Sequence, residues 1–469
     1  MFKHIEFMYI ERTDKMSNNI KLIQTAKDTD DRLAEKEEVK FKTDANENLA
    51  TVEVNPEEEF QDITGFGGAF TEAGGYTLSQ VPEEVRDEVL EAYFHPEKGI
   101  GYTLCRTHIN SCDFSLGNYA YTETEGDTEL EDFDISRDEE YLIPFIKDAE
   151  KVEGAEFKLF SSPWSPPAWM KTNGRMNKGG SLKEEYWQTW ADYFAKYIKE
   201  YQKKDIDIWG VTIQNEPMAE TPWDNCIYED EEERDFVKVL GPTLKEAGLD
   251  DVKIMVWDHN KDIMKSRVDT ILSDPEAAQW VWGVGFHWYG EDDTQSIVDD
   301  EVLSYTYETY DKELVFTEGC NPLFDEDNFF GEWWTGEKYG RHIIADLNHY
   351  TTGWVDWNMV LNEEGGPNHV ENYCDAPIIV DTENNEIIYE SPYYYLGHFS
   401  KYMKPGATKI SCETDNDQLL VTAVRNPDGE IVVVVMNDSE EELSFNLKGQ
   451  NGESAEIVSP AHSIQTLIY

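Results

Sequence analysis

Eight short apolar runs follow one another along the first three quarters of this chain, and segments with helical periodicity lie between most of them. An uninterrupted apolar run is typical of a parallel strand buried on both faces. Strands that alternate with helices build α/β folds, and eight such units predict a closed (β/α)8 barrel. The runs centre near Ile63, Thr103, Leu159, Val211, Met255, Val284, Val315 and Val355.

Two of the intervening helices are well marked. Residues 82–94 begin with Pro82, which suits the first position of a helix. From Glu184 to Lys204 aromatic residues recur at helical spacing and predict an amphipathic helix whose aromatic stripe belongs to the core. The helices expected after Met255 and Val284 have the weakest periodicity, so a doubly wound open sheet remains the alternative to a barrel.

The pattern changes near Asp381, beyond which the helical period is lost and short β-rich segments follow. Strong turn signals separate these segments, and residues 19–59 contain similar strand-like stretches. We therefore expect an all-β sandwich built from both ends of the chain. The expected division is N-terminal strands over 19–59, a catalytic barrel over 60–381 and a C-terminal sandwich domain over 382–469.

The chain is strongly acidic, with 97 Asp and Glu against 39 Lys and Arg and a formal net charge of -58. The acidic residues are spread along the sequence, so runs such as Glu57–Glu59 are interpreted as solvated surface. A charge of this sign repels nucleic acid and anionic membranes. We infer adaptation to high salt and exclude nucleic acid as a partner.

Residues 1–20 contain no apolar stretch as long as the core of a signal peptide, and no apolar stretch of the sequence is as long as a membrane span. We expect a cytoplasmic protein of a salt-adapted organism, without stable membrane association, in which Met16 could be the true start. The six cysteines show no paired CxxC spacing and are expected to be free thiols. The sequence does not indicate an oligomeric state.

Two of the apolar runs lead into a glutamate, Glu216 in Thr212-Ile-Gln-Asn-Glu-Pro217 and Glu318 in Leu314-Val-Phe-Thr-Glu-Gly319. In a barrel enzyme, residues at the carboxyl ends of strands point into the active site. Two carboxyls held roughly 5 Å apart are what a retaining glycosidase requires. Either glutamate alone would be read as a loop charge or a neighbour of a helix N-cap, but the pair favours glycoside hydrolysis.

Polar and aromatic residues gather at the other expected strand ends. Aromatic rings bind the C–H faces of sugars, and carboxylate, amide and imidazole groups bind their hydroxyls. Each tryptophan alone is typical of a core residue, and His287 alone of a buried histidine, but their shared position favours a sugar subsite. They are Asn110 and Asp113, Trp164 and Trp169, Asn215, His287, Trp288 and Tyr289, and Trp357 and Asn358.

These motifs resemble glycoside hydrolase family 30. The resemblance runs from about residue 60 to the end of the chain, in order and spacing, and two further motifs are most similar to the glucosylceramidase branch, namely Gly365–His369 and Asp375–Ile379. The segments that carry the family resemblance are Gly65–Phe70, Ser161–Gly174, Thr212–Pro217, His287–Tyr289, Phe316–Cys320 and Gly353–Asn358.

The resemblance implies a role for each candidate residue. Glu216 would be the acid/base and Glu318 the nucleophile, while His287 and Tyr289 would lie beside the two carboxylates. The residues that would line the sugar subsite are Asp113, Trp164, Asn215, Trp357 and Asn372. The fold that the resemblance implies is again a barrel with a β-sandwich.

The predicted activity is retaining hydrolysis of terminal β-D-glucosides by double displacement. The charge on Glu318 is expected to raise the pKa of Glu216 and keep it protonated. No cofactor or metal is expected, because the histidines show no HExxH motif or comparable ligand spacing. The alternatives are the same chemistry on a β-1,6-glucan, β-xyloside or β-fucoside, or a carbohydrate-binding protein without catalysis, for which the two glutamates would be unnecessary.

The net charge of -58 predicts a salt-dependent stability. Exposed carboxylates repel one another over a Debye length of about 10 Å at 0.1 M salt but only about 3 Å at 1 M. The melting temperature and the activity are therefore expected to rise between low and molar NaCl. A thermal melt across a salt series measures this, and a flat or falling melting temperature would contradict the inferred salt adaptation.

Overall fold

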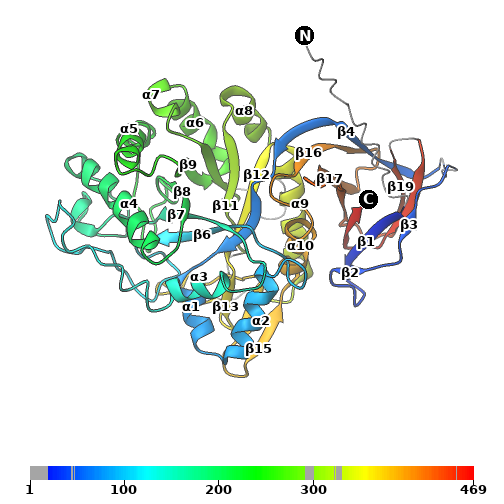
Figure 1. The fold of residues 1–469 in the computed structure, drawn as a ribbon, viewed down its shortest axis with the longest axis horizontal. Coiled ribbons are helices and arrows are strands. Elements are labelled where there is room, and N and C mark those ends of the chain that lie inside the picture. Colours follow the sequence, from blue (N-terminus) through cyan, green and yellow to red (C-terminus); the bar gives the residue numbers. More distant parts are fainter. Residues whose placement is uncertain are drawn as a thin grey trace, which may run out of the picture.

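The computed structural model describes residues 19–43, 46, 48–290, 300–321, 323, 330–449 and 452–469. The expected start at Met16 lies outside these residues. A helix-rich body and a sheet-rich body lie side by side, and the chain passes from the second into the first along β4 (Ala50–Asp62) (Figure 1). No helix of the described ranges has the length and apolar character needed to cross a membrane.

The helix-rich body is a closed barrel of eight parallel strands, which confirms the predicted fold class. Leu104, Phe160, Met255, Val315 and Val355 form a separate buried cluster with one residue from each of five strands, and this cluster fills the barrel interior. The strands are β5 (Gly65–Ala69), β6 (Leu104–Ile109), β7 (Lys158–Pro163), β8 (Ile208–Thr212), β9 (Lys253–Asn260), β10 (Gly283–His287), β11 (Glu313–Glu318) and β12 (Thr351–Asn358).

Helices lie between successive strands, including those with the weakest sequence signal. The helix predicted over 82–94 is α2, and the one predicted over 184–204 is a 3-10 turn, η2, followed by α4. The helices are α1 (Glu72–Ser79), α2 (Glu83–Phe94), α3 (Leu142–Ala149), η1 (Ala168–Met170), η2 (Glu184–Tyr186), α4 (Trp187–Gln202), α5 (Asp230–Glu246), η3 (Lys261–Ile263), α6 (Met264–Leu272), α7 (Pro275–Ala278), α8 (Glu301–Tyr310) and α9 (Trp333–Asn348).

The sheet-rich body combines strands from both ends of the chain in one ten-stranded sheet, as expected. β4 pairs with β16 and β19, so the N-terminal region is built into the C-terminal strands. The strands are β1 (Asn19–Ala26), β2 (Ala34–Glu35), β3 (Val39–Lys40), β4, β16 (Thr408–Thr414), β17 (Leu419–Arg425), β18 (Ile431–Asn437), β19 (Leu443–Lys448), β20 (Ser454–Ser459) and β21 (Ser463–Ile468).

The two bodies share a packed interface through β18. Its odd-numbered residues Val433 and Val435 belong to the core between the sheet layers. Its even-numbered residues Val434 and Met436 belong to the large core of the barrel. Burial on both faces explains the unbroken apolar sequence of this strand, and it fixes the sandwich against the helices of the barrel.

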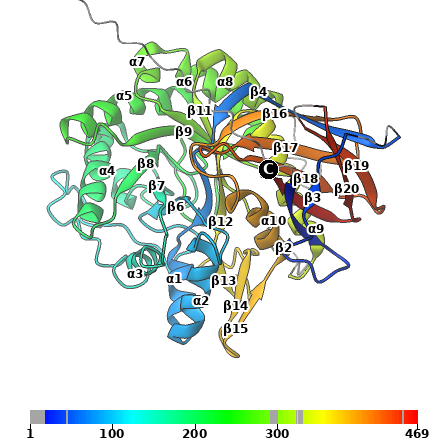
Figure 2. The same cartoon turned by 45° about the vertical axis from the view of Figure 1, so that its right-hand side comes forward.

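The expected loss of helical structure beyond Asp381 was wrong, because α10 (Ser391–Ser400) is a helix. It contacts α9, β5, β1 and β21, so nearly all its residues are buried and it has no polar face to reveal the helical period. The β-rich segment 386–389 is β15 (Glu386–Tyr389), which pairs with β14 (Ile378–Asp381). Together with β13 (Val360–Asn362) they form a separate three-stranded sheet that lies next to α1 and α2 (Figure 2).

Candidate active site

The two predicted catalytic glutamates line one cavity of about 330 Å³ at the carboxyl ends of the barrel strands. Glu318 is the last residue of β11, and Glu216 lies in the loop that follows β8. Glu216 has a left-handed backbone with φ of 48°, and its N–H donates to the carbonyl of Asp258 at 2.9 Å. Residues other than glycine are strained in this backbone conformation. The hydrogen bond to Asp258 on the neighbouring strand holds Glu216 in it.

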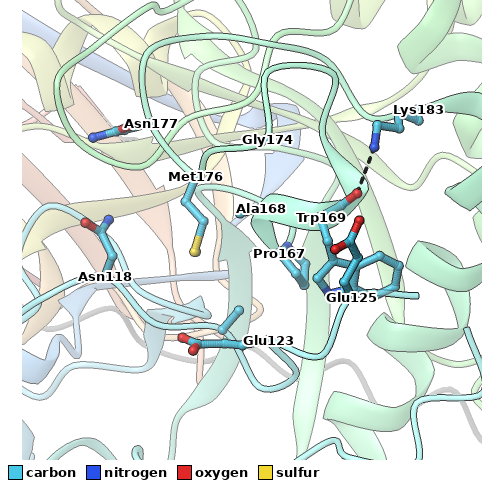
Figure 3. Close-up of a pocket in the computed structure, with 11 residues that line it drawn as sticks. Asn118, Glu123, Glu125, Pro167, Ala168, Trp169, Gly174, Met176, Asn177 and Lys183 are labelled. Carbon is cyan, nitrogen blue, oxygen red and sulfur yellow. Dashed lines mark hydrogen bonds between the residues drawn. The ribbon is translucent and has the colours of Figure 1, made fainter. Parts of the chain in front are cut away.

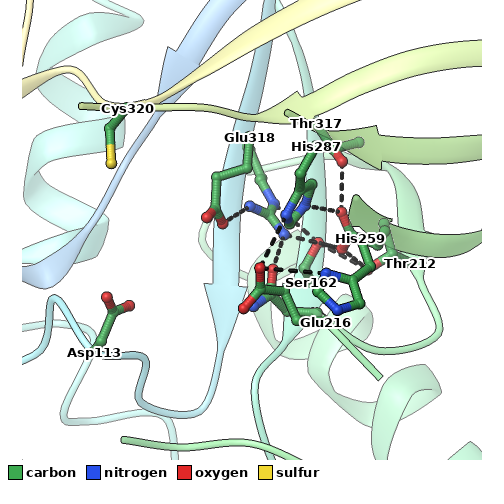
Figure 4. A network of polar contacts seen from close by, with 12 residues as sticks. Asp113, Ser162, Thr212, Glu216, His259, His287, Thr317, Glu318 and Cys320 are labelled. Carbon is green, nitrogen blue, oxygen red and sulfur yellow. Dashed lines mark hydrogen bonds and ion pairs between the residues drawn. The ribbon is translucent and has the colours of Figure 1, made fainter. Parts of the chain in front are cut away.

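The structure brings together the two glutamates and the seven residues that the family resemblance places around them. All of these line the cavity except His287, whose Nδ1 lies 3.5 Å from the Glu216 carboxylate (Figure 4). Of the other residues expected at strand ends, Trp169 lines a neighbouring cavity, while Asn110, Trp288 and Asn358 are buried and do not line this one. The cavity is also lined by Phe114, Trp223, Cys320 and Cys374. The six cysteines are free, as expected.

The lining of the cavity has an aromatic part and a polar part. Trp164 and Trp357 stack with their ring centroids 5.0 Å apart. Among the polar residues, Asn372 Nδ2 donates to Asp113 Oδ2 at 3.1 Å, while the other oxygen of this buried aspartate has no protein partner. Burial and the charge on Glu318 raise the pKa of Asp113 well above its ordinary value. An apolar face beside an unsatisfied carboxyl suits a sugar ring, which offers C–H groups on one side and hydroxyls at its edge.

Arg106 on β6 organises the base of the cavity and was not predicted from the sequence. Its side chain is fully buried, and Nη1 donates to Glu318 Oε2 at 2.5 Å. Nη2 donates to Asn215 Oδ1 at 2.7 Å and to Asp258 Oδ2 at 2.9 Å, and Nε donates to Ser162 Oγ at 3.0 Å. One planar guanidinium therefore fixes the expected nucleophile and the residue before the expected acid/base.

Asp258 on β9 is the partner that makes the burial of Arg106 tolerable. Its Oδ2 also accepts from Ser162 and Thr212, and its Oδ1 accepts from Thr317 Oγ1 at 2.5 Å and from His287 Nε2 at 3.0 Å. Burial raises the pKa of Asp258, but the charge of Arg106, the charge and hydrogen bond of His287 and the hydrogen bond of Thr212 together outweigh it and lower the pKa below its ordinary value. An ionised acceptor with this many donors keeps the surrounding side chains in single orientations.

A β-bulge places Asp258 under the site. In the pairing of β9 with β10, Trp257 is opposite Gly285 and His259 is opposite Phe286, so Asp258 is an extra residue, and its φ is 55°. A bulge re-aims the side chains that follow it. As a result two successive residues both face the site: Asp258 pairs with Arg106, and His259 lies next to Glu216.

His259 is the third site residue, after Arg106 and Asp258, that was not predicted from the sequence. Its Nδ1 lies 3.4 Å from Glu216 Oε1, the same oxygen that His287 approaches. Burial raises the pKa of Glu216, but the two imidazoles outweigh it and lower the pKa below the ordinary value of a glutamate. Burial also lowers the pKa of His287, yet Glu318 and the other surrounding carboxylates raise it to about 9.

The expectation that the charge on Glu318 would keep Glu216 protonated was therefore wrong for the free enzyme. The two histidines have the larger effect on the pKa of Glu216, and His259 could not be placed from the sequence. Burial also raises the pKa of Glu318, and the charge on Glu216 adds to this against the charges of His287 and Arg106. These directions favour a proton on His287 over one on Glu216.

The sequence did contain a signal for two of the missed residues. Arg106 and Asp258 are charged residues in the interior of two barrel strands, LCRTHI and KIMVWDHN. Charged side chains are almost never fully buried without a partner, so one interior charge of opposite sign in each of two buried strands predicts a pair. His259 had no comparable signal, because the bulge that turns it toward Glu216 is not visible in the sequence.

A larger cavity of about 590 Å³ lies beside the first but contains neither glutamate. It is formed by the loops after β6 and β7, with Trp169 and Met176 against Glu123 and Glu125 (Figure 3). The loop that carries Trp223 lies between the two cavities, since Asn177 of the larger cavity donates to the carbonyl of Pro222 at 2.9 Å. This arrangement places the second cavity next to the one that Glu216 and Glu318 line.

Two family models match the chain. The model of the glycosyl hydrolase family 30 TIM-barrel domain matches residues 63–403, and the model of the family 30 beta sandwich domain matches residues 406–467. The chain is a member of glycoside hydrolase family 30 and a glycoside hydrolase.

Individual relatives include glucosylceramidases and glucanases. The chain is 36% identical over 430 residues to the lysosomal acid glucosylceramidase of Mus musculus, covering 89% of this chain and 82% of that protein. Among solved structures, SrfJ from Salmonella typhimurium has a TM-score of 0.89 at 36% identity and covers 96% of this chain and 99% of its own. An endo-β1,6-glucanase has a TM-score of 0.85 at 28% identity, with 97% and 99% coverage.

The role of Arg106 is tested by Arg106→Lys, which keeps the charge but loses the planar fork that reaches three acceptors. Because a small displacement of reacting groups costs about 100-fold in rate, kcat/KM for a glycoside is expected to fall by roughly that factor with the circular dichroism spectrum unchanged. The matched control is Arg137→Lys, which alters a partly exposed pair with Glu72. Equal activity in the two variants would show that the fork is not needed.

Proposed function

We propose that this glycoside hydrolase releases glucose from terminal β-D-glucosides with retention, by double displacement. The observation that carries the proposal is the different surroundings of the two glutamates in one cavity. Glu318 Oε2 is held by the guanidinium of Arg106 at 2.5 Å, whereas Glu216 Oε1 faces two imidazoles at 3.4 and 3.5 Å. A carboxylate that is fixed by a guanidinium suits a nucleophile, and a carboxylate beside two imidazoles can exchange a proton with them.

In the first step Glu318 attacks the anomeric carbon while the leaving oxygen takes a proton from Glu216. The protonated His287 lies next to Glu216 and supplies the proton that this residue donates. Arg106 keeps one oxygen of Glu318 fixed, so the other is directed to the sugar. The aromatic pair Trp164 and Trp357 and the unsatisfied oxygen of Asp113 hold the ring.

In the second step water hydrolyses the glycosyl-enzyme. Formation of the ester removes the negative charge of Glu318, which is one of the charges that raise the pKa of His287. The affinity of the histidine and Glu216 for a proton falls accordingly. Glu216 therefore stays ionised and acts as the base toward the incoming water.

The choice of a β-glucoside is supported by similarity to the mouse protein named lysosomal acid glucosylceramidase. The similarity to an endo-β1,6-glucanase supports a β-1,6-glucan as the second candidate, with the second cavity beside the first available for further sugar units. The two candidate substrates share the glucose unit and the glycosidic bond that is broken. They differ only in the leaving group, which is a lipid in one and a second sugar in the other.

The substrate is tested with a panel of nitrophenyl β-glycosides together with gentiobiose and glucosylceramide. The β-glucoside is expected to have the highest kcat/KM of the nitrophenyl compounds. Faster hydrolysis of the β-xyloside or β-fucoside would replace glucose as the sugar, and no hydrolysis of any member would favour a binding protein. Gentiobiose and glucosylceramide then distinguish a glucan from a lipid substrate.

The nucleophile is tested by Glu318→Gln and by labelling. The variant keeps the volume of the side chain but cannot form the covalent intermediate, so turnover is expected to fall by about 1000-fold or more. A 2-deoxy-2-fluoro β-glucoside should label Glu318 of the unaltered protein, as located by mass spectrometry of peptides. Labelling of a different carboxylate would overturn the assignment.

The position of the proton is tested by the pH dependence of kcat/KM. The pKa of His287 is raised to about 9, so activity is expected to hold up to that pH and to decline above it. In His287→Gln the alkaline limb should move down by about one pH unit or more, since Glu216 must then hold the proton alone. His349→Gln, at the end of α9 outside the cavity, should leave the limb in place. If activity instead declined from near neutral pH, and did so equally in the unaltered protein and in the His287 and His349 variants, the role of His287 would be contradicted.

A further inference from the structure

We propose that Glu216, His259 and His287 form a binding site for a late first-row divalent cation, Zn²⁺ above all, and that the bound ion inhibits hydrolysis. The binding itself needs no assumption about the reaction. The inhibition rests on the proposed function, because it requires Glu216 to exchange protons.

The spacing of the three side chains fits a zinc site. Within the described residues they are the one group of three or more His, Cys, Asp or Glu whose ligand atoms could hold a metal, with all three atoms within 4.8 Å of one another. The Nδ1 atoms of His259 and His287 lie 3.4 and 3.5 Å from Glu216 Oε1. Zinc bonds of about 2.0–2.1 Å in a tetrahedron place neighbouring ligand atoms roughly 3.3–3.5 Å apart. The two carboxylate–imidazole separations already have this length, and the two Nδ1 atoms, which lie within 4.8 Å of each other, complete the set after at most a small rotation of the rings.

The two imidazole nitrogens have no other partner. Both Nδ1 atoms are buried and make no hydrogen bond, although polar atoms in such places are normally satisfied. Both Nδ1 atoms are directed at Glu216 Oε1. Without a proton or a metal ion between them, the lone pairs of the two nitrogens would repel those of the oxygen. A cation at this point would satisfy three buried atoms at once.

The surroundings of His287 match those of a metal ligand. Its Nε2 donates to the ionised Asp258 at 3.0 Å, which leaves Nδ1 to face Glu216. A histidine that gives its second nitrogen to a carboxylate is oriented and made a stronger donor to a metal. Asp258 itself is held by Thr317 and Arg106, so the orientation is fixed before any ion arrives.

The charge of the site also favours a dication. The carboxylates of Glu216, Asp258 and Glu318 lie around one buried guanidinium, that of Arg106, which pairs with Asp258 and Glu318. A dication that displaces the proton of His287 therefore enters a site with an excess of negative charge. Two imidazoles and one carboxylate select zinc or copper over magnesium and calcium, which prefer oxygen ligands. Because Glu216 borders the cavity, a water molecule can complete the tetrahedron from that side.

A bound ion would occupy the atom on which catalysis depends. Glu216 Oε1 would be bonded to the metal and could neither give a proton to the leaving oxygen nor take one from water. Inhibition should therefore be reversible by a chelator and should affect both steps of the reaction.

The test measures binding and activity separately on the intact protein. Isothermal titration with Zn²⁺ should give one site, and His259→Asn should weaken it by more than about 100-fold, since even residues that only support a ligand contribute about 10–100-fold. The matched control is His462→Asn, which removes a histidine that likewise lies between two glutamates, Glu337 and Glu440, but far from the cavity. It should leave the Zn²⁺ affinity unchanged.

Activity of each variant is compared with its own metal-free value. Zn²⁺ should inhibit the unaltered protein at the concentration that fills the site, and EDTA should restore it, while Mg²⁺ and Ca²⁺ up to 100-fold higher should not inhibit. Weak Zn²⁺ binding that is the same in the His259 and His462 variants would mean adventitious binding by surface carboxylates and would overturn the site. One-site binding without glycosidase activity would keep the metal site and reject the proposed function, so the two failures are distinguishable.

Discussion

The buried ion pair of Arg106 and Asp258 is the interaction on which the rest of the site depends. Neither side chain is accessible, and their charged atoms lie 2.9 Å apart. Isolated burial of either charge would cost several kcal/mol, so each requires the other and the hydroxyl and imidazole groups around them. Glu318, Asn215 and His287 are positioned by this pair and not by contact with substrate.

The side chains of the site come from separate strands of the barrel. Two shifts of strand register allow them to point to the same place in its interior. The bulge at Asp258 adds one residue to β9, and the pairing of β10 with β11 shifts in the same region, where His287 is opposite Glu318 and Thr317 is the extra residue. Thr317 Oγ1 then donates to Asp258. Without the two shifts the regular inward and outward alternation of a strand would turn these groups away.

The sequence predicted the parts of the structure that depend on simple periodicity or on position at a strand end. The eight barrel strands depend on periodicity. Glu216, Glu318 and the six predicted substrate-binding residues that line the cavity depend on position at a strand end or on the family motifs. It could not predict α10, because a helix buried on all sides has no polar period. It also missed His259, whose direction is set by a bulge, and it therefore gave the wrong direction for the pKa of Glu216.

In the proposed mechanism Glu318 forms a covalent bond to the sugar, and Glu216 transfers the protons before and after that intermediate. Its stereochemical consequence follows directly, since two displacements at the anomeric carbon restore the original configuration. The most direct measurement is proton NMR of the sugar first released from a β-glucoside, recorded before mutarotation. The account predicts the β anomer, and an initial α anomer would contradict it by requiring a single displacement by water.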